Sequence, residues 1–506
     1  MHNAIWKIAN NLRGSIDGWD FKVYVLVPMF YRYLSAHLIK VTNDKFDIKD
    51  YENLNDEDVL LYKDIIIAEL GFFIAPSELF NNVLKKAKLE QNKQSDLNII
   101  LSNIFKNISN SANEDSRKNF EGLFSDFDTS NRNLGDDIKD RNTRLLKILE
   151  GIELMPLGEY TSGEHDAFGD AYEYLISMYA SNAGKSGGEY FTPQEVSKLL
   201  MMLAIFEHES TMNLSIYDPA CGSGSLLLQA KRFVKDKENI SKYCGQEINP
   251  TTYNLARMNM FLNGVSYSDF EIAKGDTLIN DKFKDQKFDI VVSNPPYSLK
   301  WVGKSDVTLL NDERYKDAGV LAPASNADYA FVLTCLYHLN NTGTASIVCF
   351  PGIFYRNGAE LEIRKYLVTN NFIDAVIQLP SNLFFGTSIT TCILVLKKNK
   401  KDNNILFIDA KDEFVKVTNK NKLSDENISK IYETYKERKN LDKFSKLVLI
   451  NDIEKNNFNL AVNSYIDTTI EKEVIDIDKL ENQIDETVNK IDDLRLKIKN
   501  ITKEIR

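Results

Sequence analysis

The sequence predicts an α/β protein with a doubly wound sheet between an N-terminal helical domain and a C-terminal helical tail. Helical and short strand patterns alternate between residues 160 and 410, as in a sheet covered by helices on both faces. Residues 1–155 show helix-period apolar spacing with little strand alternation, and the remaining residues, 411–506, end in a long amphipathic helix. We therefore expect three domains, at 1–155, 160–410 and 411–506.

The composition fits a folded protein of this size. The chain has 506 residues, of which 43% are hydrophobic and 11% aromatic, enough for about two or three domains. No apolar run approaches the roughly 20 residues that cross a bilayer, and the N-terminus lacks a secretory pattern, so we expect a cytoplasmic protein with no membrane partner. The five cysteines share no metal-type spacing and the histidines are scattered, which predicts reduced thiols and no metal site.

The N-terminal domain should begin with one long helix. Asp20 is a candidate cap, and apolar residues then recur at helical spacing: Phe21, Tyr24, Val25, Pro28, Phe30, Tyr31, Leu34 and Leu38. Contact with a substrate or with a second copy of the chain, and plain packing, both stay open as roles for this domain.

Four predicted strand ends of the middle domain carry polar side chains: Asp218, Glu247, Asp276 and Asn294. Ligands of open α/β sheets bind outside the carboxyl ends of the strands, so these side chains should line one crevice. Taken singly, each acid could equally be a helix cap or a solvated turn. All four in order along the chain favour a binding site.

The loop after Asp218 is built from small residues, Gly222, Ser223, Gly224 and Ser225, before a helix that starts at Leu226. Its two glycines and the acid at the strand end do not match the dinucleotide fingerprint, and a carboxylate suits a cationic ligand better than a pyrophosphate. Glu247 lies 23 residues beyond Gly224, where nucleotide-binding α/β folds place the acid that holds ribose hydroxyls.

The most informative motif is Asn294, Pro295, Pro296 and Tyr297, directly after the apolar run 288–293. An amide oxygen and the carbonyl of the first proline can accept both hydrogens of an exocyclic amino group, which exposes its lone pair to an incoming methyl group. The prolines hold both acceptors rigidly. Tyr297 offers a flat face on which an extruded base can stack. Alone, Asn-Pro-Pro after a strand is more often a plain turn, but together with the strand-end residues upstream the motif predicts methylation of an amino group.

Together these motifs resemble the amino-group methyltransferases that use S-adenosylmethionine. More narrowly, they resemble the adenine-N6 DNA methyltransferase that forms the modification subunit of type I restriction-modification systems. Further strings shared with that family are Leu12–Gly14, Trp19–Phe21, Gly169–Leu175, Gly187–Pro193, Asn326–Phe331, Leu379–Thr387 and Asn457–Leu460. The resemblance covers nearly the whole chain, and the strings at 187–193 and 379–387 are the most specific to the family.

The resemblance implies a site-specific DNA methyltransferase with S-adenosylmethionine as cofactor. Asp218 would lie near the methionine end of the cofactor and Asp276 near its adenine, and Asn294 and Pro295 would hold the target amino group. Phe385 is a candidate for a second aromatic wall of the base pocket, with a core position as the alternative. The other residues implied in cofactor contact are Glu189, Tyr190, Phe191, Thr192, Pro193, Gln194, Gly222, Ser223, Gly224, Ser225 and Glu247.

The net charge of −11 has the wrong sign for a chain that grips DNA phosphates unaided. A partner that supplies sequence recognition and phosphate contacts would resolve this conflict, although a local basic cleft would as well. The resemblance implies two copies of this chain bound to one specificity subunit, with a restriction subunit as a further partner.

Two segments suggest contacts with partners. Residues 298–326 follow the amino-holding motif, are polar and lack clear periodicity, which favours a mobile loop facing DNA or else a surface insertion. In the tail, apolar residues recur at steps of three and four, which predicts a helix that pairs with another helix or folds back on its own domain. These residues are Ile470, Val474, Ile477, Leu480, Ile484, Val488, Ile491, Leu494, Ile498, Ile501 and Ile505.

Rival functions stay open on the residues alone. The same Asn-Pro-Pro-Tyr arrangement serves methyltransferases that act on RNA, on protein glutamine or, with a different first residue more often, on cytosine N4. A non-catalytic assembly subunit is an alternative of another class. Failure to bind cofactor would separate the last from the others.

Overall fold

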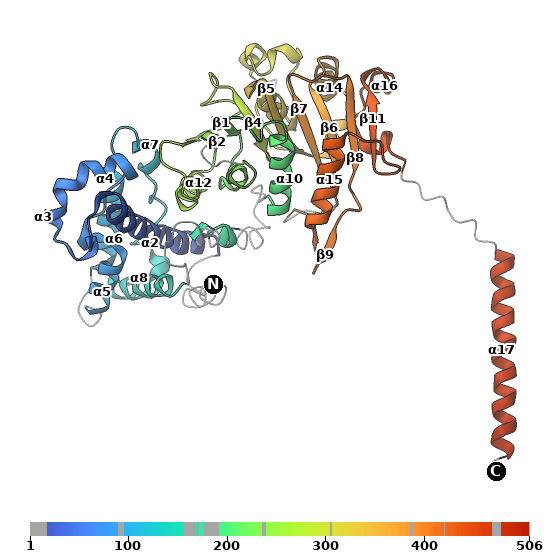
Figure 1. The fold of residues 1–506 in the computed structure, drawn as a ribbon, viewed down its shortest axis with the longest axis horizontal. Coiled ribbons are helices and arrows are strands. Elements are labelled where there is room, and N and C mark those ends of the chain that lie inside the picture. Colours follow the sequence, from blue (N-terminus) through green and yellow to red (C-terminus); the bar gives the residue numbers. More distant parts are fainter. Residues whose placement is uncertain are drawn as a thin grey trace. The chain divides into compact units, whose positions relative to one another are not determined.

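The computed structural model describes residues 18–89, 96–155, 168–169, 172–176, 192–234, 239–303, 306–384, 388–418, 420–467 and 477–504. The chain divides into two compact units, residues 1–466 and residues 467–506. The first unit contains a helical region and a large sheet (Figure 1).

The N-terminal region is helical, as the sequence predicted. Its first described helix, α2 (Gly18–Phe46), starts before Asp20, so Asp20 lies in the first turn and not at the cap. Pro28 lies inside this helix, where it has no backbone N–H to donate a helical hydrogen bond. The helices that follow are α3 (Asp56–Val59), α4 (Lys63–Leu70), α5 (Phe80–Leu89), α6 (Leu97–Ser111), α7 (Arg117–Phe120) and α8 (Ile138–Glu153).

The sheet of the first unit has the strand order β11-β8-β6-β7-β5-β4-β1-β2-β3. Strand β7 runs antiparallel to both of its neighbours, β5 and β6, and β11 runs antiparallel to β8, whereas the other neighbouring pairs are parallel. The strands are β1 (Leu214–Asp218), β2 (Ile240–Glu247), β3 (Phe270–Lys274), β4 (Phe288–Ser293), β5 (Leu339–Cys349), β6 (Ile373–Gln378), β7 (Cys392–Lys397), β8 (Asn404–Asp409) and β11 (Ser445–Leu449).

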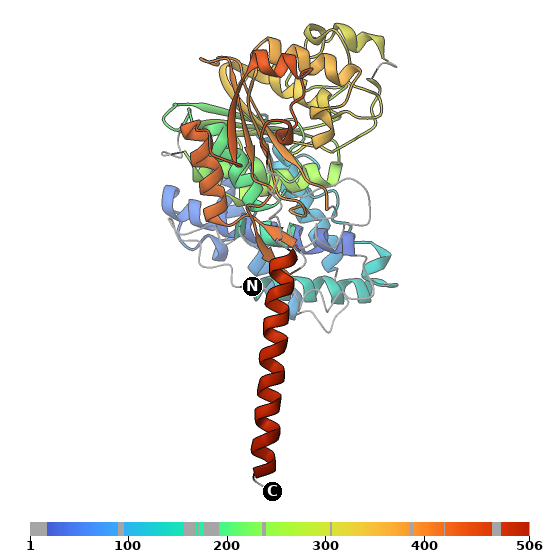
Figure 2. The same cartoon turned by 90° about the vertical axis from the view of Figure 1, so that its right-hand side faces the viewer.

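Helices cover both faces of this sheet, so it is doubly wound (Figures 1 and 2). Along β4, Ile290 and Val292 belong to one hydrophobic cluster and Val291 to the other, as expected from side chains that alternate along a strand. The helices packed on the sheet are α10 (Gln194–Ile205), α11 (Ser225–Leu228), α12 (Pro250–Leu262) and α15 (Asp425–Glu437) on the first face, and α13 (Asp328–His338) and α14 (Ala359–Thr369) on the second.

The sheet continues beyond residue 410, where the sequence placed the end of the catalytic domain. Strand β11 pairs with β8, and the compact unit extends to Ile466. A separate hairpin, β9 (Val415–Val417) and β10 (Lys420–Lys422), and helix α15 lie between β8 and β11 in the sequence. Helix α16 (Ile450–Lys455) follows β11. Ser424 caps α15, because its Oγ accepts from the backbone N of Asn427 at 3.3 Å. The boundary was misplaced because one short antiparallel edge strand has no distinctive pattern.

The described part of segment 298–326 is packed against the sheet. Leu309, Tyr315 and Leu321 are buried in the cluster of the second face. Arg314 is 7% exposed and donates to the carbonyl oxygens of Thr277 at 2.6 Å and Leu278 at 2.9 Å. The sequence favoured a mobile loop in this segment. It gave no sign of these packing contacts, because short 3₁₀ turns leave no periodic signal.

Helix α12 joins the helical region to the sheet through a buried arginine. Arg257 is 1% exposed, and its guanidinium group lies over the ring of Tyr253. Its Nη1 donates to the carbonyl oxygens of Lys118 at 3.1 Å and Glu121 at 2.9 Å. Both acceptors belong to the region around α7. This contact fixes the helical region on the outer side of α12.

Replacing Arg257 with methionine is expected to lower the free energy of unfolding by about 2 kcal/mol, because two carbonyl groups lose their donor inside the protein. Urea denaturation would measure the change. Arg117→Met, at an exposed position of α7, is the control and should stay within about 0.5 kcal/mol of the parent. Equal stabilities of the two variants would contradict the role given to Arg257.

The second unit contains helix α17 (Ile477–Glu504). Its apolar residues from Leu480 to Ile501 are exposed, between 45% and 63%. The predicted positions Ile470, Val474 and Ile505 lie outside the described residues. Within the described ranges, the structure contains no helix with the length and hydrophobicity needed to cross a membrane.

Candidate active site

The carboxyl ends of β1, β2, β3 and β4 meet at one edge of the sheet because these strands are parallel neighbours. The chain runs outwards from β1 to β2 and β3, then returns to the other side of β1 as β4. This reversal makes the space between β1 and β4 the point where open α/β sheets bind ligands. Asp218 ends β1 and Asn294 follows β4, so these two predicted residues flank that point.

The two strand ends are joined by a hydrogen bond between buried side chains. Ser293, the last residue of β4, donates from Oγ to Oδ1 of Asp218 at 2.9 Å. Asp218 is 2% exposed and also accepts from the backbone N of Ala220 at 2.9 Å. Burial raises the pKa of Asp218 to about 7, although both hydrogen bonds act to lower it. Such a carboxyl group ionises readily when a cationic group comes near.

Two glycines shape the loop after β1. Gly222 and Gly224 have φ values of 55° and 75°, in the left-handed region that glycine enters without strain. A Cβ on Gly224 would lie 2.8 Å from Cε of Met260 in α12, whereas a Cβ on Gly222 would meet nothing within 4 Å. Gly224 is therefore needed for packing, and the backbone at Gly222 is open to the approach of a ligand.

Glu247, at the end of β2, is tied to this glycine loop. Its Oε2 accepts from the backbone N of Gly222 at 3.0 Å, and its Oε1 accepts from the backbone N of Asn249 at 2.7 Å. These two bonds hold the Glu247 carboxylate between the glycine loop and the turn that follows β2.

The loop after β3 is attached to the same place. Thr277 donates from Oγ1 to the carbonyl oxygen of Pro219 at 2.6 Å. The preceding residue, Asp276, accepts at Oδ1 from the backbone N of Leu278 at 2.9 Å. Three loops with carboxylates, those at Asp218, Glu247 and Asp276, are thus linked to one another by short polar contacts at the sheet edge.

The Asn-Pro-Pro-Tyr motif lies at the carboxyl end of β4. Nδ2 of Asn294 donates to Oγ1 of Thr192 at 2.9 Å, and its Oδ1 accepts from the hydroxyl group of Tyr297 at 2.5 Å. The Tyr297 ring contacts Phe384 edge to face, with ring centroids 6.2 Å apart. Pro295 is buried, and Asn294 and Tyr297 are half-buried. This arrangement presents an amide and an aromatic side chain beside the buried acid of β1.

Comparison with known proteins gives the family. The profile of the N-6 DNA Methylase family matches residues 163–474, and that of the HsdM N-terminal domain matches residues 1–152. The chain is 50% identical over its whole length to the Type I restriction enzyme MpnII methylase subunit of Mycoplasma pneumoniae, 96% of which is covered. This chain belongs to the methylase subunits of type I restriction enzymes.

Further relatives agree with this assignment. The methylase subunit is 33% identical to the Type I restriction enzyme MjaVIII methylase subunit of Methanocaldococcus jannaschii, over 92% of this chain and 78% of the relative. It matches the crystal structure of the type I restriction-modification system methyltransferase subunit from Streptococcus thermophilus with a TM-score of 0.83 at 36% identity, covering 92% of this chain and 99% of that one. The predicted fold and family are therefore confirmed.

Some predicted site residues lie outside the described part of the methylase subunit. These are Glu189, Tyr190, Phe191 and Phe385. Thr192, Pro193 and Gln194 are described: Thr192 contacts Asn294, and Gln194 donates from Nε2 to Oγ of Ser225 at 2.9 Å. Near residue 385, the aromatic side chain seen beside Tyr297 is Phe384.

The structure adds residues that sequence reasoning missed. Ser293, Thr277 and Arg314 connect the strand ends and loops of the site. Ser293 could have been found, because it is a polar residue at a strand position that the alternation directs inwards. Arg314 gave no comparable signal, since its carbonyl partners are set by the tertiary fold.

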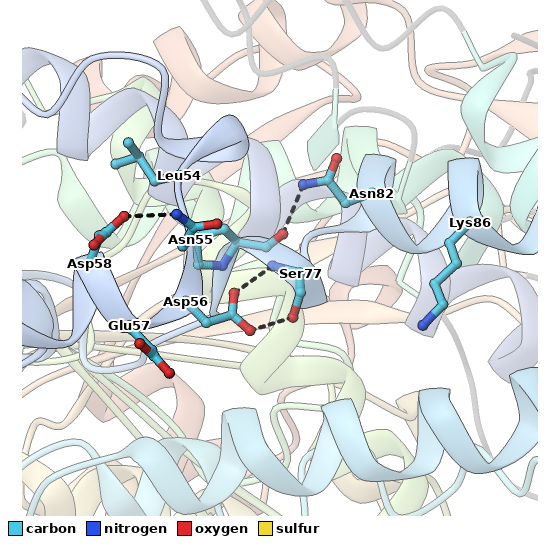
Figure 3. Close-up of a pocket in the computed structure, with 9 residues that line it drawn as sticks. Leu54, Asn55, Asp56, Glu57, Asp58, Ser77, Asn82 and Lys86 are labelled. Atoms are coloured by element: carbon cyan, nitrogen blue, oxygen red, sulfur yellow. Dashed lines mark hydrogen bonds between the residues drawn. The ribbon is translucent and has the colours of Figure 1, made fainter.

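A hollow of about 600 Å³ also lies in the helical region of the methylase subunit (Figure 3). Two of its acids are hydrogen-bonded locally: Asp56 accepts from the backbone N and the hydroxyl group of Ser77 at 2.9 and 2.6 Å, and Asp58 accepts from Asn55 at 3.1 Å. The bonds of Asp56 join α3 to the short turn Pro76–Glu78 that precedes α5, and the bond of Asp58 lies within the start of α3. Among the residues with described positions, no cluster of histidine, cysteine and acidic side chains could hold a metal ion.

Proposed function

We propose that this methylase subunit transfers a methyl group from S-adenosylmethionine to N6 of an adenine that has been turned out of DNA. The observation that carries the proposal is the hydrogen bond between Ser293 and Asp218, which holds the strand end bearing Asn294 beside the buried acid. A methyl donor near Asp218 and an amino group at Asn294 would then be neighbours. Membership of the N-6 DNA Methylase family supports this assignment.

The residues present fit S-adenosylmethionine. Its charged methionine end suits a buried carboxylate, and Asp218, with its pKa raised by burial, is such a group. Glu247 would accept hydrogen bonds from the ribose hydroxyl groups, and Asp276 would lie near the adenine ring. The open space at Gly222 leaves room for close approach of the cofactor to the backbone. When bound, S-adenosylmethionine supplies an electrophilic methyl group on sulfur.

Asn294 and Pro295 would hold the target amino group by accepting hydrogen bonds from its two N–H groups. Acceptors in this position favour a pyramidal nitrogen with its lone pair available, and they stabilise the positive charge that develops on it. The amino group of adenine would replace the Tyr297 hydroxyl group at Oδ1 of Asn294. The Tyr297 ring, supported by Phe384, would then stack on the base. Turning the base out of the helix is required because a stacked, paired amino group cannot be reached in line.

The partners follow from charge and from helix α17. We propose that a specificity subunit supplies most DNA contacts, because the chain has a net charge of −11. Two copies of this chain per specificity subunit, with α17 bound to that subunit and a restriction subunit as a further partner, complete the proposed assembly. The relatives come from bacteria and archaea, whose DNA lies in the cytoplasm, and we place the activity there.

Binding of S-adenosylmethionine is expected to release a proton near neutral pH. The pKa of Asp218 is raised to about 7 in the folded protein, so below that pH the folded protein holds a proton that the unfolded chain has already lost. The stability gained from this proton is lost as the pH rises through about 7. A cationic cofactor favours the ionised form, so its Kd should fall as the pH rises from about 6 to about 8. Calorimetry in buffers of different ionisation enthalpy measures the proton release. Asp218→Asn should remove the buffer dependence, and a buffer-independent enthalpy in the parent would contradict the placement.

The experiment that tests the proposed function uses the chain purified in complex with a specificity subunit. The complex is incubated with labelled S-adenosylmethionine and separate DNA, RNA and protein fractions, and the modified base is identified by mass spectrometry. N6-methyladenine in DNA is the expected product. Label in cytosine N4, RNA or glutamine would point to a rival function, and no cofactor binding would indicate an assembly subunit.

A further inference from the structure

The side-chain amide of Asn294 is held at both of its ends. Nδ2 donates to Oγ1 of Thr192 at 2.9 Å, and Oδ1 accepts from the Tyr297 hydroxyl group at 2.5 Å. Tyr297 is the proposed wall of the base pocket, so the end of the amide that faces Tyr297 is the end that faces the base. Thr192 occupies the opposite end.

Thr192 is itself fixed by the chain on its C-terminal side. Pro193 is buried and is the residue before the first turn of α10, with φ of −54°. Gln194, the next residue, donates from Nε2 to Oγ of Ser225 at 2.9 Å and accepts at Oε1 from Nε2 of Gln229 at 2.6 Å. Ser225 and Gln229 are 7% and 1% exposed. The segment 192–194 therefore links Asn294 to the start of α11, directly after the glycine loop.

The direction in which this amide points decides whether it can hold an amino group. An amide has an acceptor at one end and a donor at the other, and the two ends are nearly equal in size. Rotation by half a turn would place NH₂ of Asn294 against the NH₂ of adenine, donor against donor. When the amide oxygen faces the base, Nδ2 of Asn294 needs an acceptor behind it, and the Thr192 hydroxyl oxygen supplies that acceptor in a half-buried place.

We propose that Thr192 is a positioning residue that accepts from Nδ2 of Asn294 and so holds the amide in place while its oxygen receives the target amino group. This role differs from the cofactor contact that family resemblance implies for residues 189–194. It rests on the proposed function, since it assumes that Oδ1 of Asn294 receives the amino group. Because the same segment reaches Ser225 through Gln194, the amide is held by an element anchored at the end of the glycine loop.

Two substitutions of Thr192 separate the hydroxyl group from the shape of the side chain. Thr192→Val keeps the shape and removes the hydrogen bond, whereas Thr192→Ser keeps the hydroxyl group. The complex with the specificity subunit is assayed on unmodified genomic DNA with tritiated S-adenosylmethionine. Thr192→Val should lower kcat about tenfold, the effect of one lost hydrogen bond, with the Kd of the cofactor changed less than about twofold. Thr192→Ser should recover most of the lost kcat.

Other results would overturn the inference. A weakened cofactor Kd at unchanged kcat in Thr192→Val would assign Thr192 to cofactor binding. Equal losses of kcat in the valine and serine variants would mean that the methyl group, and not the hydroxyl group, matters. A thermal unfolding scan of each variant separates both results from loss of the fold.

Asn294→Ala distinguishes this inference from the proposed function. If Thr192 acts through Asn294, then adding Thr192→Val to Asn294→Ala should lower kcat no further. Full turnover by Asn294→Ala would remove the proposed function itself. Loss of turnover in Asn294→Ala, together with parental kcat in Thr192→Val, would remove only the role of Thr192.

Discussion

Replacing Asn294 with alanine is expected to lower kcat by about 10²–10³-fold, the range seen when one preorganised polar group is taken from a transition state. The amide oxygen lies at the end of β4, beside the buried Asp218 and next to two prolines that restrict the backbone. It should stabilise the amino group mainly as that group becomes positive. The loss should therefore appear in kcat far more than in the KM for DNA.

Cofactor binding separates this role from a structural one. The carboxylates Asp218 and Glu247 are held by Ser293 and by backbone groups, and not by Asn294. The Kd of S-adenosylmethionine for Asn294→Ala, measured by calorimetry, should therefore stay within about threefold of the parent. Asn341→Ala is the control: this exposed asparagine lies near the start of β5, at the opposite edge of the sheet, and the variant should keep parental turnover. Normal methylation by Asn294→Ala would exclude the proposed chemistry.

The sequence predicted the site through its strand ends. Asp218, Glu247 and Asn294 each end or follow a strand, and parallel pairing brings them to one edge. Hydrophobic runs of four to eight residues mark such buried strands clearly. A single sequence is therefore enough to predict that an acid follows a buried strand, and at which edge of the sheet that acid lies.

Other features depend on tertiary contacts and could not be predicted in this way. Burial shifts the pKa of Asp218, and burial comes from Ser293 and the surrounding fold, not from neighbouring residues in the chain. Arg314 donates to carbonyl groups 36 and 37 residues away in the sequence. The predicted end of the sheet at residue 410 was too early because β11 is a single antiparallel strand that follows a helix.

Helix α17 offers the second large effect, on assembly. Ile484, Ile491 and Ile498 of this helix lie seven positions apart. Leu480, Leu494 and Ile501 lie three residues after Ile477, Ile491 and Ile498. The members of this stripe from Leu480 to Ile501 are exposed. A stripe of this kind is buried against a partner helix in a coiled coil. We therefore expect the stripe to carry most of the binding energy between this chain and the specificity subunit.

The charges beside the stripe argue against pairing of two α17 helices in parallel. In that arrangement Lys490 of one helix would face Arg495 of the other, and this flanking contact would repel. Up to Asp493 the helix has six acidic and two basic residues, whereas the four charged residues from Arg495 to Lys503 are all basic. A partner helix from another protein, with the complementary order of charges, would satisfy both halves.

Two leucines in α17 give a matched test of this interface. Leu494 lies on the stripe and is 57% exposed, whereas Leu496 lies on the opposite face and is 63% exposed. Leu494→Asn should weaken binding to the specificity subunit by about 100-fold, because about 2–3 kcal/mol of apolar burial is lost. Leu496→Asn should change the Kd by less than about threefold, since its side chain stays in water in both states. Equal effects of the two substitutions, measured by calorimetry, would mean that the stripe does not form the interface.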